Sequence, residues 1–151
     1  MRNKLQQRKQ QGFTIVEVLI VLAIAGLIIL VVLLAVPALQ RNGRNTAIKN
    51  DASAVAGGIS EFESNNDGIV PNSITASAGV VAISGASGQP TNAKVQGGTI
   101  VNSDGSVTPA LGTISARIGY RCDGAASGRA IAVWYSTENS SATPQYKCVD
   151  S

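Results

Sequence analysis

The hydrophobic pattern of the chain begins with one long, uninterrupted run. From Phe13 to Val36 the sequence has 24 residues, and Glu17 is their only ionisable side chain. A transmembrane helix needs about 20 predominantly apolar residues, so this run is long enough to cross a bilayer. Charges inside a membrane helix are costly and mark functional sites by default. The pattern therefore predicts a membrane helix over residues 13–37 in which Glu17 has a purpose.

After Pro37 the pattern becomes that of an amphipathic helix. Apolar side chains recur at three- and four-residue steps over residues 38–63, and polar side chains fill the other positions. The apolar positions are Leu39, Ala47, Ile48, Ala52, Val55, Ile59 and Phe62. Gly43, Gly57 and Gly58 should each weaken the helix by about 1 kcal/mol relative to alanine. We therefore predict one apolar stripe on which a domain packs, with fraying or bending at these glycines.

Composition changes sharply at Ser64. Residues 64–98 are rich in Gly, Ser, Ala, Asn and Thr, which predicts a long surface loop with one brief strand or helix. Residues 99–151 have the pattern of an antiparallel sheet. Its first part is a predicted hairpin, in which Thr99–Val101 and Ser106–Thr108 flank the turn sequence 102–105.

The alternation of apolar and polar residues predicts the remaining strands. Residues 113–122 alternate between apolar and polar positions, with Ile114, Ala116 and Ile118 on the face expected to be buried. Asp123 and Gly124 form the next turn, and Ala130–Ser136 and Gln145–Val149 make two further strands. A long helix packed on a small antiparallel sheet is an α+β fold.

Two cysteines, Cys122 and Cys148, lie in this last region. The chain has no histidine, and neither cysteine belongs to a Cys-x-x-Cys pair, so a zinc or redox site is not indicated. A structural disulfide is the expectation for an exported domain. Closing a loop of about 27 residues is worth roughly 3.5 kcal/mol in the chain-entropy model. The alternative is a pair of reduced thiols in a cytosolic protein, which requires the opposite membrane topology.

Charge gives a weak indication of orientation. The formal net charge is +3 and the pI is about 9.1. Four basic residues precede the apolar run (Arg2, Lys4, Arg8 and Lys9), and three follow it (Arg41, Arg44 and Lys49). The positive-inside rule then favours a cytoplasmic N-terminus and an external C-terminus.

Little in the sequence indicates catalysis. Without histidine the usual Ser-His-Asp and Cys-His arrangements are excluded, and no phosphate-binding loop, dinucleotide fingerprint or EF-hand loop is present. Asp67, Asp104 and Asp123 each precede a glycine, which suits turns more than calcium ligation. We expect a protein that is not an enzyme and needs no cofactor or metal.

One basic feature of the predicted sheet allows two interpretations. Arg117 and Arg121 fall on the same face of a predicted strand, and Arg129 follows the next turn. A solvated sheet face is the simpler interpretation, and a patch that captures DNA is the alternative.

The start of the apolar run resembles a known signal. A basic leader, Gly12, and then Phe-Thr-Ile-Val-Glu-Val-Leu-Ile-Val-Leu-Ala-Ile-Ala-Gly are similar to the class III signal of type IV pilins and pseudopilins. The resemblance implies that a membrane-embedded prepilin peptidase cuts after Gly12 and N-methylates Phe13. It also implies that Glu17, four residues along the helix and on the same face as Phe13, meets the α-amino group of a neighbouring subunit. A charge paired across subunits favours a defined axial register.

Further along the helix the resemblance has one departure. Gly26 lies where pilins commonly have a helix-loosening glycine, and Val36–Gln40 is similar to the sequence that often closes the family's membrane segment. Pro37 comes about three residues later than usual. Gly26 and Pro37 are therefore candidates for a kink or for local melting when subunits pack. The alternative is a lipid-tolerated kink with no special role. The resemblance also agrees with a C-terminal disulfide between Cys122 and Cys148.

Taken as a whole, the resemblance implies a structural subunit of a surface filament that serves adhesion, twitching motility or DNA uptake. The precursor would be a single-pass inner-membrane protein with its C-terminus outside, and the product an extracellular pilus. The implied partners are prepilin peptidase, identical or related pilin subunits, an inner-membrane assembly platform and membrane lipid, with DNA or a host or cell surface beyond these.

Removing residues 1–12 takes away four positive side chains and leaves 8 basic against 9 acidic residues.

Other interpretations of the N-terminal region stay open. A Sec signal peptide has a shorter apolar core of about 7–15 residues, with its cleavage site at the far end. A single-pass anchor for an extracellular binding domain explains the length of the run but neither Glu17 nor the Gly12–Phe13 junction. A type II secretion pseudopilin would share the processing, and its major form would add a C-terminal calcium site that the sequence does not indicate.

Overall fold

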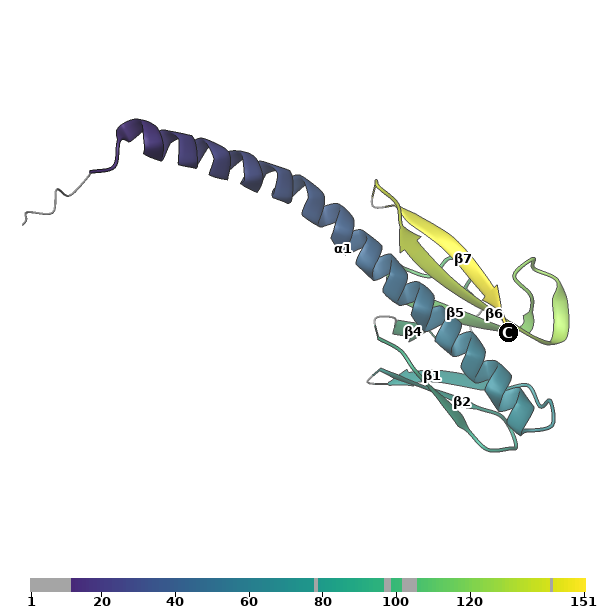
Figure 1. The fold of residues 1–151 in the computed structure, drawn as a ribbon. Coiled ribbons are helices and arrows are strands. Elements are labelled where there is room, and N and C mark those ends of the chain that lie inside the picture. The colour runs from purple at the N-terminus through teal and green to yellow at the C-terminus, as the bar shows by residue number, and fades with distance from the viewer. Residues whose placement is uncertain (1–11, 78, 97–98, 102–105, 142) are drawn as a thin grey trace, which may run out of the picture. The chain divides into compact units, whose positions relative to one another are not determined.

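The computed structural model describes residues 12–77, 79–96, 99–101, 106–141 and 143–151. The basic leader residues 2, 4, 8 and 9 and Asp104 lie outside this set. The chain divides into two compact units, Met1–Pro37 and Ala38–Ser151. The elements, drawn in Figure 1, are α1 (Ile15–Asn65), β1 (Ser73–Ser77), β2 (Val80–Ser84), β3 (Thr91–Lys94), β4 (Thr99–Val101), β5 (Thr113–Tyr120), β6 (Ala126–Glu138) and β7 (Pro144–Asp150).

The described part of the first unit is the apolar portion of α1 and the residues that lead into it. Gly26 and Pro37 both lie inside the helix, and neither ends it. The kink or melting inferred from these two residues stays a prediction.

In the second unit the apolar stripe of α1 forms one wall of the core. Ile48, Ala52, Val55, Ile59 and Phe62 are all buried, as the helical periodicity predicts. Two members of the predicted stripe are not buried: Ala47 is half-buried, and 68% of the surface of Leu39 is exposed. Ile74, Val81 and Ile83 from one sheet and Ile114, Ala116, Ile131 and Val133 from a second sheet complete the core.

The helix continues through Gly43, Gly57 and Gly58, where fraying or bending was expected. A Cβ at Gly58 would lie 2.8 Å from Ile83 Cδ1 and 3.1 Å from Ala93 Cβ, whereas a Cβ at Gly57 would meet nothing within 4 Å. Gly58 therefore lets the helix backbone approach β2 and β3 closely. Fraying at Gly57 and Gly58 was a wrong prediction, because packing against the sheet stabilises this stretch against its low helix propensity. Bending at the glycines stays a prediction.

Residues 64–98, expected to be a loop with at most one brief strand, contain three. Strands β1, β2 and β3 form an antiparallel sheet in that order. Ile74, Val81 and Ile83 are fully buried against the helix. The loop prediction underestimated this region because three apolar side chains, rather than the polar residues around them, determine its structure.

The second sheet has the order β4-β5-β6-β7, and it is antiparallel except where β4 pairs parallel with β5. The predicted hairpin of Thr99–Val101 with Ser106–Thr108 is therefore wrong, because residues 106–108 form no strand and Thr99 pairs with Thr113. Its turn, 102–105, lies outside the described residues. The α+β class is confirmed, with one long helix on two small sheets.

Strand β5 ends earlier than predicted. The pairing of β5 with β6 is irregular between Ile118 and Tyr120, and Gly119 between them has a φ of 82°. A left-handed residue of this kind is accessible to glycine at little cost and is typical of a bulge. The alternation that placed Arg117 and Arg121 on one strand face therefore breaks at Gly119, and Arg121 lies beyond the strand. Ser115, predicted to be exposed, is fully buried.

Candidate functional site

The segment from Gly12 to Glu17 forms the beginning of α1. Gly12, Phe13 and Thr14 precede the helix, which begins at Ile15. Phe13 is 86% exposed, and a Cβ at Gly12 would meet nothing within 4 Å. The Gly12–Phe13 junction, where cleavage is expected, thus lies in non-helical backbone. No other part of the described chain covers it.

A reciprocal set of hydrogen bonds joins Thr14 to Glu17. The backbone N–H of Glu17 donates to Thr14 Oγ1 at 3.3 Å. In return the backbone N–H and the hydroxyl of Thr14 donate to Glu17 Oε2 at 3.4 and 3.3 Å. This is the capping box of a helix N-terminus, in which Thr and Glu satisfy each other's free N–H groups. The negative charge of Glu17 is also favourable in the first turn of a helix.

The capping box corrects one detail of the sequence prediction. Phe13 was expected to share a helix face with Glu17, but the helix does not include Phe13, because Thr14 is its N-cap. Phe13 nevertheless lies beside Glu17, since both line a shallow groove with Val18, Val21 and Leu22. A Thr-x-x-Glu spacing before an apolar run was the sequence signal for the cap.

The apolar part of α1 has no partner among the described residues. Its large side chains are exposed, from Ile15 at 80% to Leu34 at 74%. Over 18 residues the mean hydropathy reaches 3.5, and none of that window is buried. By length and composition α1 is the one described helix that could cross a membrane. So much exposed apolar surface needs lipid or other protein chains to cover it.

These residues coincide with a known family motif. A family model described as the prokaryotic N-terminal methylation motif matches residues 7–33. The chain carries the class III prepilin signal of type IV pilins. The match includes Gly12, Phe13 and Glu17 and spans about a fifth of the chain. No curated protein and no solved structure gives a significant match.

The prepilin signal and the long apolar helix together fit a type IV pilin or pseudopilin. They also fit a membrane-anchored precursor that becomes part of a surface filament.

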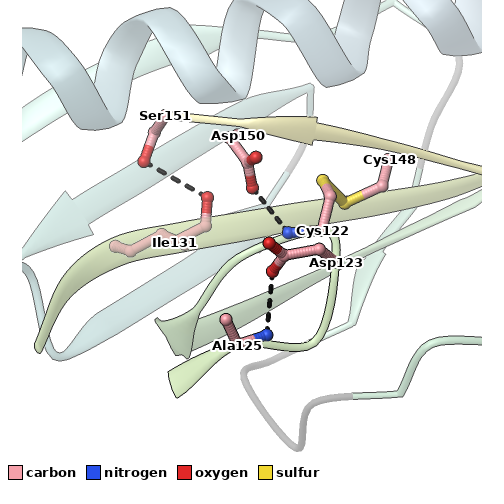
Figure 2. The surroundings of a disulfide bond; sticks show 7 residues. All are labelled: Cys122, Asp123, Ala125, Ile131, Cys148, Asp150 and Ser151. Atoms are coloured by element: carbon pink, nitrogen blue, oxygen red, sulfur yellow. Dashed lines mark hydrogen bonds between the residues drawn. A yellow bond between two sulfur atoms is a disulfide. The ribbon is translucent and has the colours of Figure 1, made fainter. Parts of the chain in front are cut away.

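A disulfide fastens the C-terminal strand of the second unit, Ala38–Ser151, which is called the outer unit from here on. Cys122, in the turn after β5, is bonded to Cys148 of β7, with their Cα atoms 5.7 Å apart. Figure 2 shows the hydrogen bonds around it. Asp150 Oδ1 accepts from the Cys122 N–H at 2.7 Å, and the Ser151 N–H and hydroxyl donate to the carbonyl of Ile131 at 3.1 and 3.2 Å. The turn and the end of β7 are thus held both covalently and by hydrogen bonds.

The residues around the disulfide include three potential metal ligands. Cys122, Cys148 and Asp150 lie close enough to share an ion. Both sulfur atoms are used in the disulfide, however, so neither offers a thiolate ligand. Asp123 Oδ1 accepts from the Ala125 N–H at 2.8 Å, and Asp67 has a φ of 53°. Both aspartates therefore stand in the turns that their Asp-Gly sequences predict.

Asn66 connects the end of α1 to the loop between β2 and β3. Its side-chain amide donates to the carbonyls of Phe62, at 2.7 Å, and Gln89, at 3.1 Å. Its Oδ1 accepts from the Gln89 N–H at 2.6 Å. Asn66 is 6% exposed; its bond to Phe62 is buried and its two bonds to Gln89 are partly buried. They satisfy a carbonyl at the helix C-terminus that the helix itself leaves free.

Glu63 and Arg129 meet near this helix end. Burial raises the pKa of Glu63 above its ordinary value, and the positive charge of Arg129 partly opposes the shift. Arg129 also donates to the carbonyl of Gly68 at 3.4 Å. Glu63 Oε1 is buried and has no hydrogen-bond partner among the described residues. Ionisation of Glu63 therefore lowers the stability of the folded state.

The outer part of α1, residues 38–65, is tied at its other end to the end of β6. Arg44 and Glu138 form an ion pair at 2.7 Å. The side-chain amide of Asn45 donates to the backbone carbonyl of Glu138 at 2.8 Å and accepts from its N–H at 2.8 Å. Asn45 therefore pairs with β6 as a neighbouring strand would. This contact cannot be predicted from the sequence, because a lone asparagine on a helix gives no signal of its distant partner.

The arginines considered as a basic patch have different neighbours. The guanidinium of Arg117 stacks over the ring of Tyr120, 3.6 Å from its centre. Arg121 follows β5 in the turn, and Arg129 contacts Gly68. The strand periodicity that suggested a shared face does not hold through the bulge at Gly119.

Proposed function

We propose that this protein is a pilin-like structural subunit of a type IV pilus-like filament and that it catalyses no reaction. The observation that carries the proposal is the prepilin signal at residues 7–33, placed at the start of an exposed apolar helix. In this proposal prepilin peptidase cuts after Gly12, Phe13 becomes the N-methylated terminus, and the apolar part of α1 moves from lipid into a filament. The functions that such a filament can have are adhesion, twitching motility and DNA uptake.

The capping box supports a specific role for Glu17. In a chain that begins at Phe13, the new α-amino group lies next to Thr14, whose hydroxyl and N–H orient the Glu17 carboxylate. The carboxylate is thus held at the end of the helix, where it can meet the amino group of a neighbouring subunit. A carboxylate moved into an apolar environment is stable only when it is paired, so its pairing favours one axial register.

The first test is intact-mass and N-terminal peptide mass spectrometry of membrane and sheared surface fractions from the native cell. An N-methylated Phe13 terminus in the sheared fraction is expected. An uncut chain found only in membranes would contradict the proposal and favour a plain membrane anchor. A processed chain that never reaches the sheared fraction would favour the pseudopilin alternative.

Variants at the cap test the role of charge. Glu17→Gln keeps the capping box, since Gln serves at this position as well as Glu, but it removes the charge. We expect this variant to be processed and to stay in the membrane without assembling efficiently. Thr14→Ser, which keeps both hydroxyl and charge, is the matched control and should assemble normally. Normal filaments from Glu17→Gln would exclude pairing between subunits through this carboxylate.

A further inference from the structure

The outer part of α1 has its charges sorted by sign along its length. Residues 38–50 contain Arg41, Arg44 and Lys49 and no acidic residue, whereas residues 51–68 contain Asp51, Glu61, Glu63 and Asp67 and no basic residue. Acidic side chains near a helix C-terminus oppose the helix dipole, and the last turn of α1 has no basic residue to offset them. The stability of the isolated helix therefore does not account for the sorting.

The basic end of this segment opens onto a polar groove beside β6 and β7. The groove is lined by two lysines, Lys49 of α1 and Lys147 of β7, and by Asn42, Asn45, Thr46, Tyr135 and Thr137. No carboxylate lines it. Arg44 is already paired with Glu138, but neither Lys49 nor Lys147 takes part in an ion pair within the described part of the chain. The groove thus presents two exposed ammonium groups among neutral side chains.

The acidic end presents the complementary charge. Glu61 and Asp67 are exposed, and they lie about the last turn of α1 and the turn that follows it. Glu63 beside them is partly buried near Arg129, which leaves Glu61 and Asp67 as the carboxylates accessible to a partner. Opposite charges at the two ends of one helical segment can pair between identical copies when the copies are stacked in parallel with an axial shift.

We propose that the groove around Lys49 and Lys147 binds Glu61 and Asp67 of a second, axially shifted copy of this chain. The inference rests on the proposed function, since it requires parallel copies in a filament. Lys49 and Glu61 are twelve residues apart on one helix, so the shift between the two copies would be about 18 Å or somewhat more. The N-terminal helices would set one axial register between subunits. The contact would add a second constraint on that register, through opposite charges in the outer units.

Zero-length crosslinking tests the contact without any mutation. Within one copy, the side chains of Lys49 and Glu61 cannot meet across about 18 Å of helix, so an amide bond between them must join two copies. We expect carbodiimide treatment of sheared filaments, followed by peptide mass spectrometry, to link Lys49 or Lys147 to Glu61 or Asp67. Links that involve other lysines but neither of these two would overturn the proposal. Absence of any processed chain from the sheared fraction would instead count against the proposed function.

Charge reversal gives a second test. The pair Lys49→Glu and Lys147→Glu should lower the yield of sheared filaments about tenfold or more, because like charges would then face each other. Lys94→Glu makes the same change in charge on β3, outside the groove, and should assemble as the unmodified chain does. Adding Glu61→Lys and Asp67→Lys to the first pair should restore assembly. An unchanged yield from the first pair, or no recovery in the combined variant, would refute the contact.

Discussion

The two adjacent glycines of α1 allow a controlled test of how closely the helix packs on the first sheet. We predict that Gly57→Ala stabilises the outer unit and that Gly58→Ala does not. Both residues lie inside the same helix, and neither has a positive φ, so both substitutions gain the same helix propensity of about 1 kcal/mol. They differ only in what the added methyl group meets.

The structure sets the size of the difference. The new Cβ at position 57 has open space around it, whereas the one at position 58 would lie 2.8 Å from Ile83 Cδ1 and 3.1 Å from Ala93 Cβ. Ile83 can turn its terminal methyl, but the Cβ of Ala93 moves only with its strand. Overpacking a buried site costs about 1–3 kcal/mol. The free energy of unfolding of Gly58→Ala should therefore fall below that of Gly57→Ala by about this amount.

Urea unfolding of the full chain in detergent micelles provides the assay. Trp134, the single tryptophan, lies on β6 within the outer unit and reports its unfolding through fluorescence. With a slope of about 2 kcal/mol per molar urea, the two midpoints should differ by roughly 1 M. Equal stabilisation by both alanines would refute the close approach of α1 to β2 and β3.

Three further predictions use the same assay. Asn66→Ala should lower the free energy of unfolding by about 3 kcal/mol, because a buried side chain loses three hydrogen bonds together; the exposed Asn50→Ala is its control, and a similar loss in both would contradict the reasoning. Burial raises the pKa of Glu63, so ionisation costs stability as pH rises above the ordinary value of 4.5. Glu63→Gln should therefore raise the midpoint at pH 7 and lose that advantage below about pH 4, and a benefit independent of pH would exclude this cause. Cys122→Ser should cost roughly 3.5 kcal/mol without affecting cleavage after Gly12, and an unchanged midpoint would show that the disulfide contributes nothing.

The elements that the sequence predicted well are those with strong local periodicity. The helix over the apolar run, the apolar stripe from Ile48 to Phe62, and strands β5 and β6 each have a helical or strand pattern over several residues. Glu17 is a candidate site for a similar local reason, since it is the only acidic residue in the apolar run; its role stays a prediction. Its hydrogen bonds to Thr14 also have a local sequence signal, the Thr-x-x-Glu spacing before an apolar run.

The elements that were missed depend on distant partners. Ile74, Val81 and Ile83 mark their strands only through burial against α1, and the residues around them favour loops. The turn sequence at 102–105 favoured a local hairpin, but β4 pairs in parallel with Thr113–Ser115 instead. The groove at Lys49 and Lys147 joins residues almost a hundred positions apart. No local pattern could have brought them together.

The disulfide also limits how far the outer unit can be drawn out under load. If a pull is applied between α1 and the end of β7, the stretch between Cys122 and Cys148 can span only the 5.7 Å between their Cα atoms. An unconstrained chain of that separation, 26 residues, would extend to roughly 90 Å. In a subunit under tension, most of β6 and β7 would therefore not extend. Reduction of the disulfide would allow the residues between the two cysteines to extend in a single step.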